Sequence, residues 1–321
     1  RNCGLVARRG CCRTMKLGIT PWDFTDRTAR GLTEQARTAE SLGYDSFWLP
    51  ENHFNLNAIP DPLMLLEAVA AGTERIRLAT TSYLLPLRNP LQAAEQVAVL
   101  DQLSEGRVTL GVGRGYASAM LKAFNVLPRE KRKLFEWCLQ TMQQAWSGEP
   151  VALREGDEPV IVDPLPVQKP HPPIWVAAFG PKALAQAGRL GLPYLASPVE
   201  SLATLESNYA RHTVAAIEAG HAELKIVPIM RTVFVAKNSS ESNALRERIH
   251  QEAQKSGRLE EDASIDDWSI VGDEAYVRDK FAEYQERLRV SHLVATRLRI
   301  PGVDKTTLRR SVEKVAEIVG G

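Results

Sequence analysis

The chain reads IRLATTS over residues 76–82, RNPLQAAEQVAVL over residues 88–100 and RVTLGVGRGY over residues 107–116. The first run is short, apolar and β-branched, which is typical of a buried strand. In the second run Asn89 and Pro90 suit the first turn of a helix, and apolar residues then recur at helical spacing. The third run opens with another strand-like segment. Together they predict a strand, a crossing helix and a second, parallel strand, the repeating unit of an α/β protein.

The third run ends in glycines that alternate with other residues around Arg114, namely Gly111, Gly113 and Gly115. Glycines let the backbone approach a ligand closely, and arginine adds a permanent cation, so the combination suits a phosphate. A dinucleotide fingerprint would need a further glycine where Tyr116 stands and an acidic residue about 20 positions later, so that interpretation fails. The alternative is that the glycines only turn the chain and that Arg114 is a surface charge.

Strand-like and helix-like segments alternate from residue 17 to the end of the chain, the pattern of a parallel sheet with crossover helices. Eight such strands favour a closed (β/α)8 TIM barrel over an open sheet. A proline-rich stretch at about residues 148–173 breaks the pattern and is expected to be an insertion, and we expect a helix to begin at residues 271–273. The predicted strands begin at Lys16, Ser46, Arg77, Val108, Ile174, Tyr194, Ile226 and His292.

The first fourteen residues differ in kind from the rest of the chain. They contain four arginines and no acidic residue, whereas the whole chain of 321 residues has a net charge of +1. We expect residues 1–14 to be a disordered extension and residues 15–321 to form a single domain, with a basic targeting arm as the alternative for the extension. A slightly acidic body favours neither nucleic acid nor an anionic membrane as partner.

Cysteine and histidine usage argues against a metal site. Three of the four cysteines lie in the first fourteen residues, Cys138 stands alone on a predicted helix, and no spacing fits a metal site or a disulfide framework. The histidines have no second ligand at metal spacing. This usage is typical of a cytoplasmic protein.

Two further segments could carry chemistry. The run PENHFN at residues 50–55 directly follows the second predicted strand, and chemistry in a barrel sits at that end of the strands. His53, beside Asn52, is the best candidate acid–base group because histidine titrates near neutral pH, the alternative being a structural histidine. Phe179, Gly180, Pro181 and Lys182 follow another strand and open a helix whose free N–H groups suit a phosphate. The basic run at residues 129–133 is interpreted as a solvated turn.

Several of these blocks, in this order, resemble the bacterial luciferase-like flavin-dependent monooxygenase family. They are SLGYDSFW at 41–48, ENHF at 51–54, LPLRNP at 85–90, LDQLSEGR at 100–107, GVGRG at 111–115 and PVQKPHPPIWV at 166–176. The resemblance covers nearly all of residues 15–321 and implies the TIM-barrel fold.

The resemblance also assigns cofactor-binding roles. It implies that Arg114 grips the phosphate of flavin mononucleotide (FMN), that residues 179–182 form the loop that cradles it, and that Thr81 and Ser82 form a non-proline cis peptide beneath the flavin ring. Where this chain has Asn52 and Asn89, relatives have histidines, and the first of these is tied to the oxygen chemistry of the flavin. An amide can donate and accept hydrogen bonds but cannot exchange a proton, so both differences bear on catalysis.

The implied function is a two-component monooxygenase. Reduced FMN arrives from a separate reductase, and with O2 it oxidises a small, mostly apolar organic substrate held near Trp22, Phe54 and Tyr116. We expect a homodimer. Two alternatives stay open: a deazaflavin-dependent oxidoreductase of the same fold, and a non-catalytic flavin-binding partner subunit.

Overall fold

The computed structural model describes residues 15–255, 259, 263–296 and 302–320, and the statements below concern these residues. The expected disordered extension at residues 1–14 lies outside them. Among the described residues no helix is both long and apolar enough to cross a membrane.

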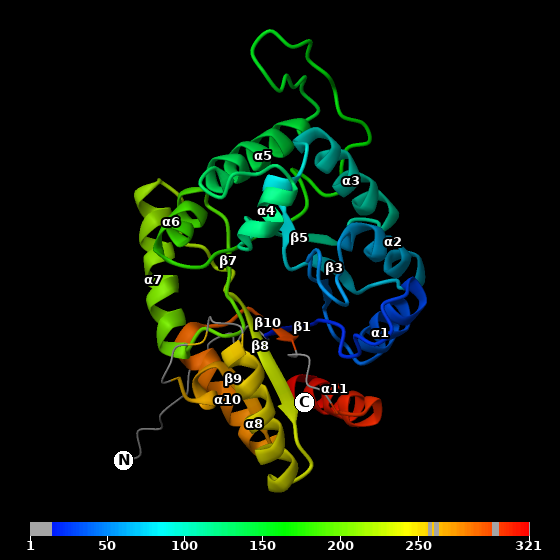
Figure 1. Cartoon of the computed structure of the whole chain (residues 1–321), viewed down its shortest axis with the longest axis vertical. Coiled ribbons are helices and arrows are strands. Elements are labelled where there is room, and N and C mark those ends of the chain that lie inside the picture. Colours follow the sequence, from blue (N-terminus) through cyan, green and yellow to red (C-terminus); the bar gives the residue numbers. More distant parts are fainter. Residues whose placement is uncertain (1–14, 256–258, 260–262, 297–301, 321) are drawn as a thin grey trace, which may run out of the picture.

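The strands form one curled parallel sheet at the centre of the molecule (Figure 1). Its strand order is β7-β6-β5-β3-β2-β1-β10-β8-β9, and β4 also pairs with β5. Directly after β7, Ala196 forms a parallel bridge to Ile229 of β8, so the curl brings distant parts of the strand order together. The strands are β1 (Lys16–Ile19), β2 (Ser46–Leu49), β3 (Arg77–Thr80), β4 (Tyr83–Leu84), β5 (Val108–Gly113), β6 (Ile174–Ala177), β7 (Tyr194–Leu195), β8 (Pro228–Val235), β9 (Ser269–Gly272) and β10 (His292–Thr296).

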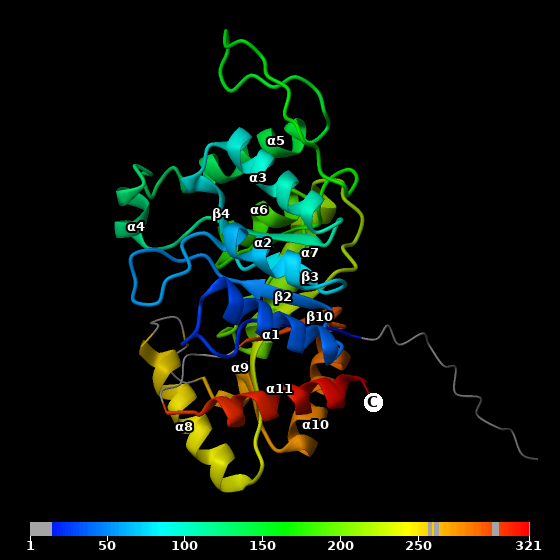
Figure 2. The same cartoon turned by 90° about the vertical axis from the view of Figure 1, so that its right-hand side faces the viewer.

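Helices surround this sheet on its outside (Figure 1), and both views show α1, α2 and α3 following one another along it (Figure 2). They are α1 (Ala29–Ser41), α2 (Pro62–Gly72), α3 (Pro90–Leu103), α4 (Ser118–Ala123), α5 (Lys131–Ala145), α6 (Pro181–Arg189), α7 (Leu202–Glu218), α8 (Ser239–Lys255), α9 (Ile265–Trp268), α10 (Glu274–Leu288) and α11 (Lys305–Gly320), with a short 3₁₀ turn, η1 (Leu85–Leu87).

The unit predicted from residues 76–116 is confirmed. β3 pairs in parallel with β5, with Leu78 opposite Val108. Helix α3 starts at Pro90 because the Asn89 side chain accepts hydrogen bonds from the N–H groups of Leu91 and Gln92. Every residue of β5 is buried, as expected for a strand covered on both faces.

Other elements differ from the sequence prediction. The expected helix start at residues 271–273 is wrong, because residues 269–272 form β9, where Ile270 and Val271 pair with β8 and are buried. The helix begins only at Glu274, capped by Asp273. Helix α2 was not predicted, although Asp61 caps it and Pro62 opens it. The seventh predicted strand begins at Pro228 rather than Ile226.

The segment between α5 and β6 projects away from the sheet (Figures 1 and 2). Its only described strand-like contact is an antiparallel bridge between Val151 and Val160. Gln168 holds the returning chain against α3, since its backbone N–H and its side-chain Nε2 donate to the two carboxylate oxygens of Asp101 at 2.9 and 2.7 Å.

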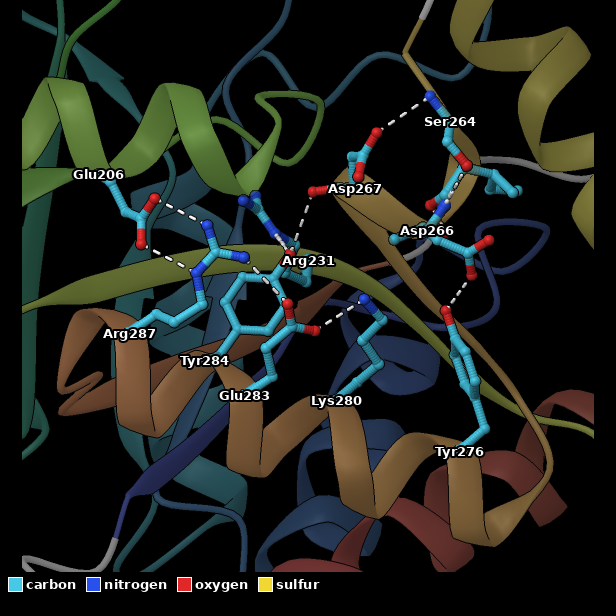
Figure 3. A network of polar contacts seen from close by, with 12 residues as sticks. Glu206, Arg231, Ser264, Asp266, Asp267, Tyr276, Lys280, Glu283, Tyr284 and Arg287 are labelled. Carbon is cyan, nitrogen blue, oxygen red and sulfur yellow. Dashed lines mark hydrogen bonds and ion pairs between the residues drawn. The ribbon is translucent and has the colours of Figure 1, made fainter.

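Arg231 of β8 belongs to a network of polar contacts with α10 (Figure 3), and it also contacts the loop after β7. Arg231 of β8 is fully buried, and its Nε donates to Tyr284 Oη of α10 at 2.7 Å. Its Nη1 donates to the Ser197 carbonyl at 3.0 Å and its Nη2 to the Glu200 carbonyl at 2.9 Å. Because these bonds satisfy the buried guanidinium, they also hold Ser197 in place at the edge of the cavity described next.

Candidate active site

A cavity of about 930 Å³ opens where β2, β3, β5, β6 and β7 end. The strands are parallel, so the segments that follow them meet at one edge of the sheet. This volume lies within the range of cofactor and small-molecule sites, about 300–1,000 Å³. The lining residues fall within segments 51–55, 81–84, 113–120, 128–132, 177–183 and 195–198.

Most of the predicted site residues meet in this cavity. The lining includes Asn52, His53, Phe54, Thr81, Ser82, Arg114, Tyr116, Phe179 and Lys182. Gly180 and Pro181 do not line it, but Gly180 is the N-cap residue of α6 beside it, with φ of +81°. Trp22 does not line it either: its side chain is buried in the main core and its backbone N–H donates to Gln35. No described residues form a group of potential metal ligands.

Arg114 is a buried cation at one end of the cavity, and no described carboxylate pairs with it. Its Nε donates to Gln186 Oε1 at 2.8 Å, its Nη1 to the Ala177 carbonyl and its Nη2 to the Ala183 carbonyl, both at 3.1 Å. Burial, and secondly the charge of Arg132, lower its pKa to about 10. A guanidinium has five N–H donors, so two remain for a ligand whose negative charge would offset this burial.

Further cations surround the same end of the cavity. Arg129, Lys131, Arg132 and Lys182 all line it, and none has an ion-pair partner among the described residues. Lys131 Nζ donates to the Gly115 carbonyl at 3.0 Å, and burial followed by the charges of Arg114 and Arg132 lowers its pKa. The basic run at 129–133 is therefore more than a solvated turn. Nothing in the sequence linked this run to Arg114, since only the fold brings them together.

Glycines bring the backbone close to the floor of the cavity. The peptide bond between Thr81 and Ser82 is cis, as the resemblance implied. A Cβ atom on Gly113 would lie 2.2 Å from Ser82 Oγ, and Gly115 has φ of +69°. The glycines around Arg114 thus serve close packing as well as a turn.

A histidine–carboxylate pair lies at another part of the cavity lining. His53 Nε2 lies 2.7 Å from Glu51 Oε1, and the Glu51 side chain is fully buried. Glu51 Oε2 accepts a hydrogen bond from the Leu84 N–H at 2.9 Å and lies 2.7 Å from Arg88 Nη2. That Nη2 makes no hydrogen bond to a described residue, so Arg88 acts on Glu51 through charge. Arg88 was not predicted as a site residue.

Aromatic rings surround His53 and the mouth of the cavity. The His53 ring meets Phe124 edge-on with ring centroids 4.8 Å apart, and Phe54 lies 5.8 Å away. Phe54, Tyr116 and Phe179 are 72%, 74% and 60% exposed, unusual for such large apolar side chains. Exposed rings around a cavity mark a binding surface for apolar groups.

The two asparagines in place of family histidines have structural contacts. Asn52 Oδ1 accepts a hydrogen bond from the Ile59 N–H at 3.1 Å, and the Asn52 backbone N–H donates to the Ile59 carbonyl. Asn52 thereby closes the 52–59 loop while lining the cavity. Asn89 caps α3 and does not belong to the lining.

Among the described residues of the lining, one buried side-chain atom has no hydrogen-bond partner. Ser197 Oγ is buried and forms no hydrogen bond with a described residue. A buried hydroxyl without a partner costs about 1–3 kcal/mol, which a ligand hydroxyl or phosphate oxygen in the cavity would offset.

Comparisons with known proteins agree with this architecture. An uncharacterised protein, y4vJ of Sinorhizobium fredii, is 27% identical over 314 residues, which cover 88% of each chain. This chain is similar in fold to the oxygenating constituent of 3,6-diketocamphane monooxygenase from Pseudomonas putida, a type II Baeyer–Villiger monooxygenase solved with FMN. The TM-score is 0.78 and the sequence identity 22%, and the match covers 95% of this chain and 98% of that one. The coenzyme F420-dependent tetrahydromethanopterin reductase of Methanopyrus kandleri matches with a TM-score of 0.71 and 19% identity over 95% and 98% of the two chains. The sequence model of the family described as luciferase-like monooxygenase matches residues 15–290. The chain therefore belongs to the luciferase-like monooxygenase family.

Proposed function

We propose that the protein is a flavin-dependent monooxygenase that uses reduced FMN, supplied by a separate reductase, and O2 to oxidise a small, mostly apolar organic substrate. The observation that carries this proposal is one cavity with unpaired cations around Arg114 and a histidine–carboxylate pair among exposed aromatic rings. Family membership supports the class of reaction. We further propose that the curled sheet is a closed (β/α)8 barrel with residues 148–173 as an insertion, and that the protein is a homodimer.

The residues present fit FMN. Arg114 and Lys182, with the N-terminus of α6 at Gly180, would hold the phosphate, because a cation pair and free helix N–H groups both favour an anion. Thr81 and Ser82 would support the ring system, and the unpaired Ser197 Oγ offers a hydrogen bond to the polar chain between ring and phosphate. The ligand's charge would be neutralised by a guanidinium that is already fixed by three hydrogen bonds.

Bound reduced FMN would supply the electrons that activate oxygen. The side chains of the cavity would orient the cofactor and the substrate, exclude water from them and hold a proton beside them. Glu51 accepts from one ring nitrogen of His53, which leaves the other nitrogen for proton transfer inside the cavity. Phe54, Phe124 and Tyr116 would cover an apolar substrate beside it.

A deazaflavin-dependent oxidoreductase is the second candidate. One observation favours it: Asn52 and Asn89 are bound to backbone groups and neither is a proton carrier. A non-catalytic flavin-binding partner subunit would keep the phosphate site but would not need the Glu51–His53 pair.

One experiment separates the three functions. The purified protein is titrated with reduced FMN and with a reduced deazaflavin, and oxygen uptake and product formation are then followed with a panel of apolar ketones and aldehydes. We expect FMN binding and oxygen uptake coupled to product. Deazaflavin binding without an oxygen requirement would overturn the proposal in favour of the second candidate, and FMN binding without turnover on any substrate would favour the partner subunit.

A further inference from the structure

Gln186 of α6 is a buried amide that contacts Arg114 without lining the cavity. Its Oε1 accepts a hydrogen bond from Arg114 Nε at 2.8 Å. Its Nε2 donates to Glu136 Oε2 at 2.9 Å and to the Arg132 carbonyl at 3.1 Å, both on α5. A guanidinium only donates hydrogen bonds and a carboxylate only accepts them, so one orientation of the amide satisfies both neighbours. Gln186 therefore fixes Arg114 relative to α5.

A carboxylate lies directly beyond this amide. Glu136 is held by Arg189, whose Nη1 and Nη2 donate to Glu136 Oε1 and Oε2 at 2.9 and 2.6 Å. The hydrogen bonds from Arg189, and less strongly from Gln186, lower the pKa of Glu136, although burial opposes them. The four side chains thus form one chain of contacts, in which an amide separates the negative charge of Glu136 from Arg114.

All three oxygens that accept hydrogen bonds from Arg114 among the described residues are neutral. One is Gln186 Oε1, and the other two are backbone carbonyls. Arg88, in contrast, lies 2.7 Å from the buried carboxylate of Glu51. A neutral acceptor directs a guanidinium without offsetting its charge, whereas a carboxylate in the same place would compete with an anionic ligand. The contacts of Arg114 therefore orient the cation and leave its charge available.

We propose that Gln186 is the positioning residue that makes the site specific for a phosphate: it holds Arg114 through a neutral oxygen and keeps the Glu136 carboxylate from pairing with it. This inference rests on the proposed function, in which Arg114 binds the phosphate of FMN. Gln186 acts through Arg114, since it does not line the cavity. A glutamate at this position would have nearly the same shape but would supply the negative charge that the ligand should bring.

The test moves the negative charge along this chain of contacts without changing the net charge of the protein. The double variant Gln186→Glu/Glu136→Gln exchanges the amide and the carboxylate, which places a carboxylate beside Arg114 and an amide beside Arg189. Glu136→Gln alone removes the distant carboxylate. Gln186→Met removes the acceptor at a similar side-chain length.

Helix α8 offers a matched control. Gln251 Nε2 donates to Glu247 Oε1 at 3.4 Å, and both residues are exposed and lie outside the cavity lining. Gln251→Glu/Glu247→Gln therefore makes the same exchange at a distant pair. Dissociation constants of reduced FMN and reduced riboflavin are measured anaerobically on each full-length variant, and thermal melting verifies folding.

We expect the exchange at 186 and 136 to raise the dissociation constant of FMN by about tenfold or more and that of riboflavin by less than about twofold, because only FMN has a phosphate. Gln186→Met should weaken FMN binding by about threefold to tenfold, since the guanidinium loses one orienting hydrogen bond but no charge. Glu136→Gln should change FMN binding by less than about twofold. The exchange on α8 should leave both ligands unchanged.

Equal losses for FMN and riboflavin, or an unchanged preference for FMN in the exchange variant, would overturn the role of Gln186, because a merely structural residue does not distinguish the two ligands. If the exchange variant does not fold, an unchanged dissociation constant for FMN in Gln186→Met would overturn it. Much tighter FMN binding in Glu136→Gln would also overturn it, since the amide would then not separate that carboxylate from Arg114. A wild type that binds FMN no more tightly than riboflavin would instead overturn the phosphate site of the proposed function.

Discussion

His53 Nε2 lies 2.7 Å from Glu51 Oε1, two residues earlier in the chain, and this pair faces the cavity directly after β2. A carboxylate on one ring nitrogen fixes the orientation and tautomer of the imidazole. The same carboxylate has Arg88 and the Leu84 N–H on its other oxygen, so it is held by charge and by hydrogen bonding. This arrangement suits a group that holds or moves a proton at a defined atom.

His53→Ala should separate oxygen uptake from product formation. One well-placed acid or base contributes about 10²–10⁴-fold in rate, so product formation should fall by at least a hundredfold while reduced FMN still binds. The measurement compares hydrogen peroxide released with product formed under the same oxygen supply. His250 is a half-buried residue of α8 outside the cavity lining, and His250→Ala is the control that should leave both quantities unchanged. Coupled turnover at the wild-type rate in His53→Ala would remove this residue from the chemistry.

Arg88→Met should lower turnover without changing FMN affinity, because Arg88 contacts Glu51 but does not line the cavity. Loss of the cation beside the buried Glu51 carboxylate changes the charge and the position of the Glu51–His53 pair, so we expect roughly a 10–100-fold loss of rate. Arg88→Lys keeps the positive charge and should therefore retain part of the turnover rate that Arg88→Met loses. A methionine variant with normal melting temperature and normal turnover would show that Arg88 only packs over the Tyr83 ring.

Arg114→Met should weaken FMN binding by roughly 1.5–3 kcal/mol and riboflavin binding much less, since riboflavin lacks the phosphate. The comparison of two ligands matters because Arg114 also holds two backbone carbonyls. Lys122→Met, an exposed cation of α4 outside the cavity lining, serves as control. Equal losses for FMN and riboflavin would place the phosphate elsewhere.

Gly113→Ala should both destabilise the protein and weaken FMN binding. The added Cβ would lie 2.2 Å from Ser82 Oγ, and overpacking of this kind costs about 1–3 kcal/mol. Gly156→Ala is the matched control: it adds the same methyl group where nothing lies within 4 Å, although its φ of +87° costs some backbone strain. Chemical denaturation and FMN titration of both variants measure the two effects. An alanine at 113 that leaves FMN affinity unchanged would show that Ser82 can move without consequence for the site.

Stability should fall between about pH 6.5 and pH 4 through His292. Burial, and then the charges of Lys16 and Arg77, lower its pKa from 6.5 to about 4. In this window the unfolded state binds a proton that the folded state does not, so the free energy of unfolding decreases as the pH falls, by about 2 kcal/mol once partial exposure is considered. The free energy of unfolding is measured by chemical denaturation at several pH values across this range. It should depend less steeply on pH in His292→Gln than in the wild type. An unchanged slope would mean that His292 titrates normally in the folded protein.

Local patterns predicted the elements with clear ends. The β3–α3–β5 unit was predictable because the cap at Asn89, the proline at 90 and the apolar periodicity all act within a few residues. His53 was predicted from its place directly after β2, whereas its contact with Glu51 was found only in the structure. β9 could not be predicted in the same way: it is four residues long, and pairing with β8 decides its conformation. Trp22 was expected near the substrate, but its side chain lies in the main core and not in the cavity lining.

Composition and motifs of the sequence alone determined the α/β class, the family, and Arg114 and His53 as the residues to examine. Only the tertiary structure decided which other charges join them. Lys131 and Arg132 reach Arg114 because α5 starts beside the end of β5, and Arg88 reaches Glu51 because η1 and β2 end at the same edge of the sheet. Such contacts depend on strand register and on the curl of the sheet, which arise from long-range pairing that no local pattern encodes.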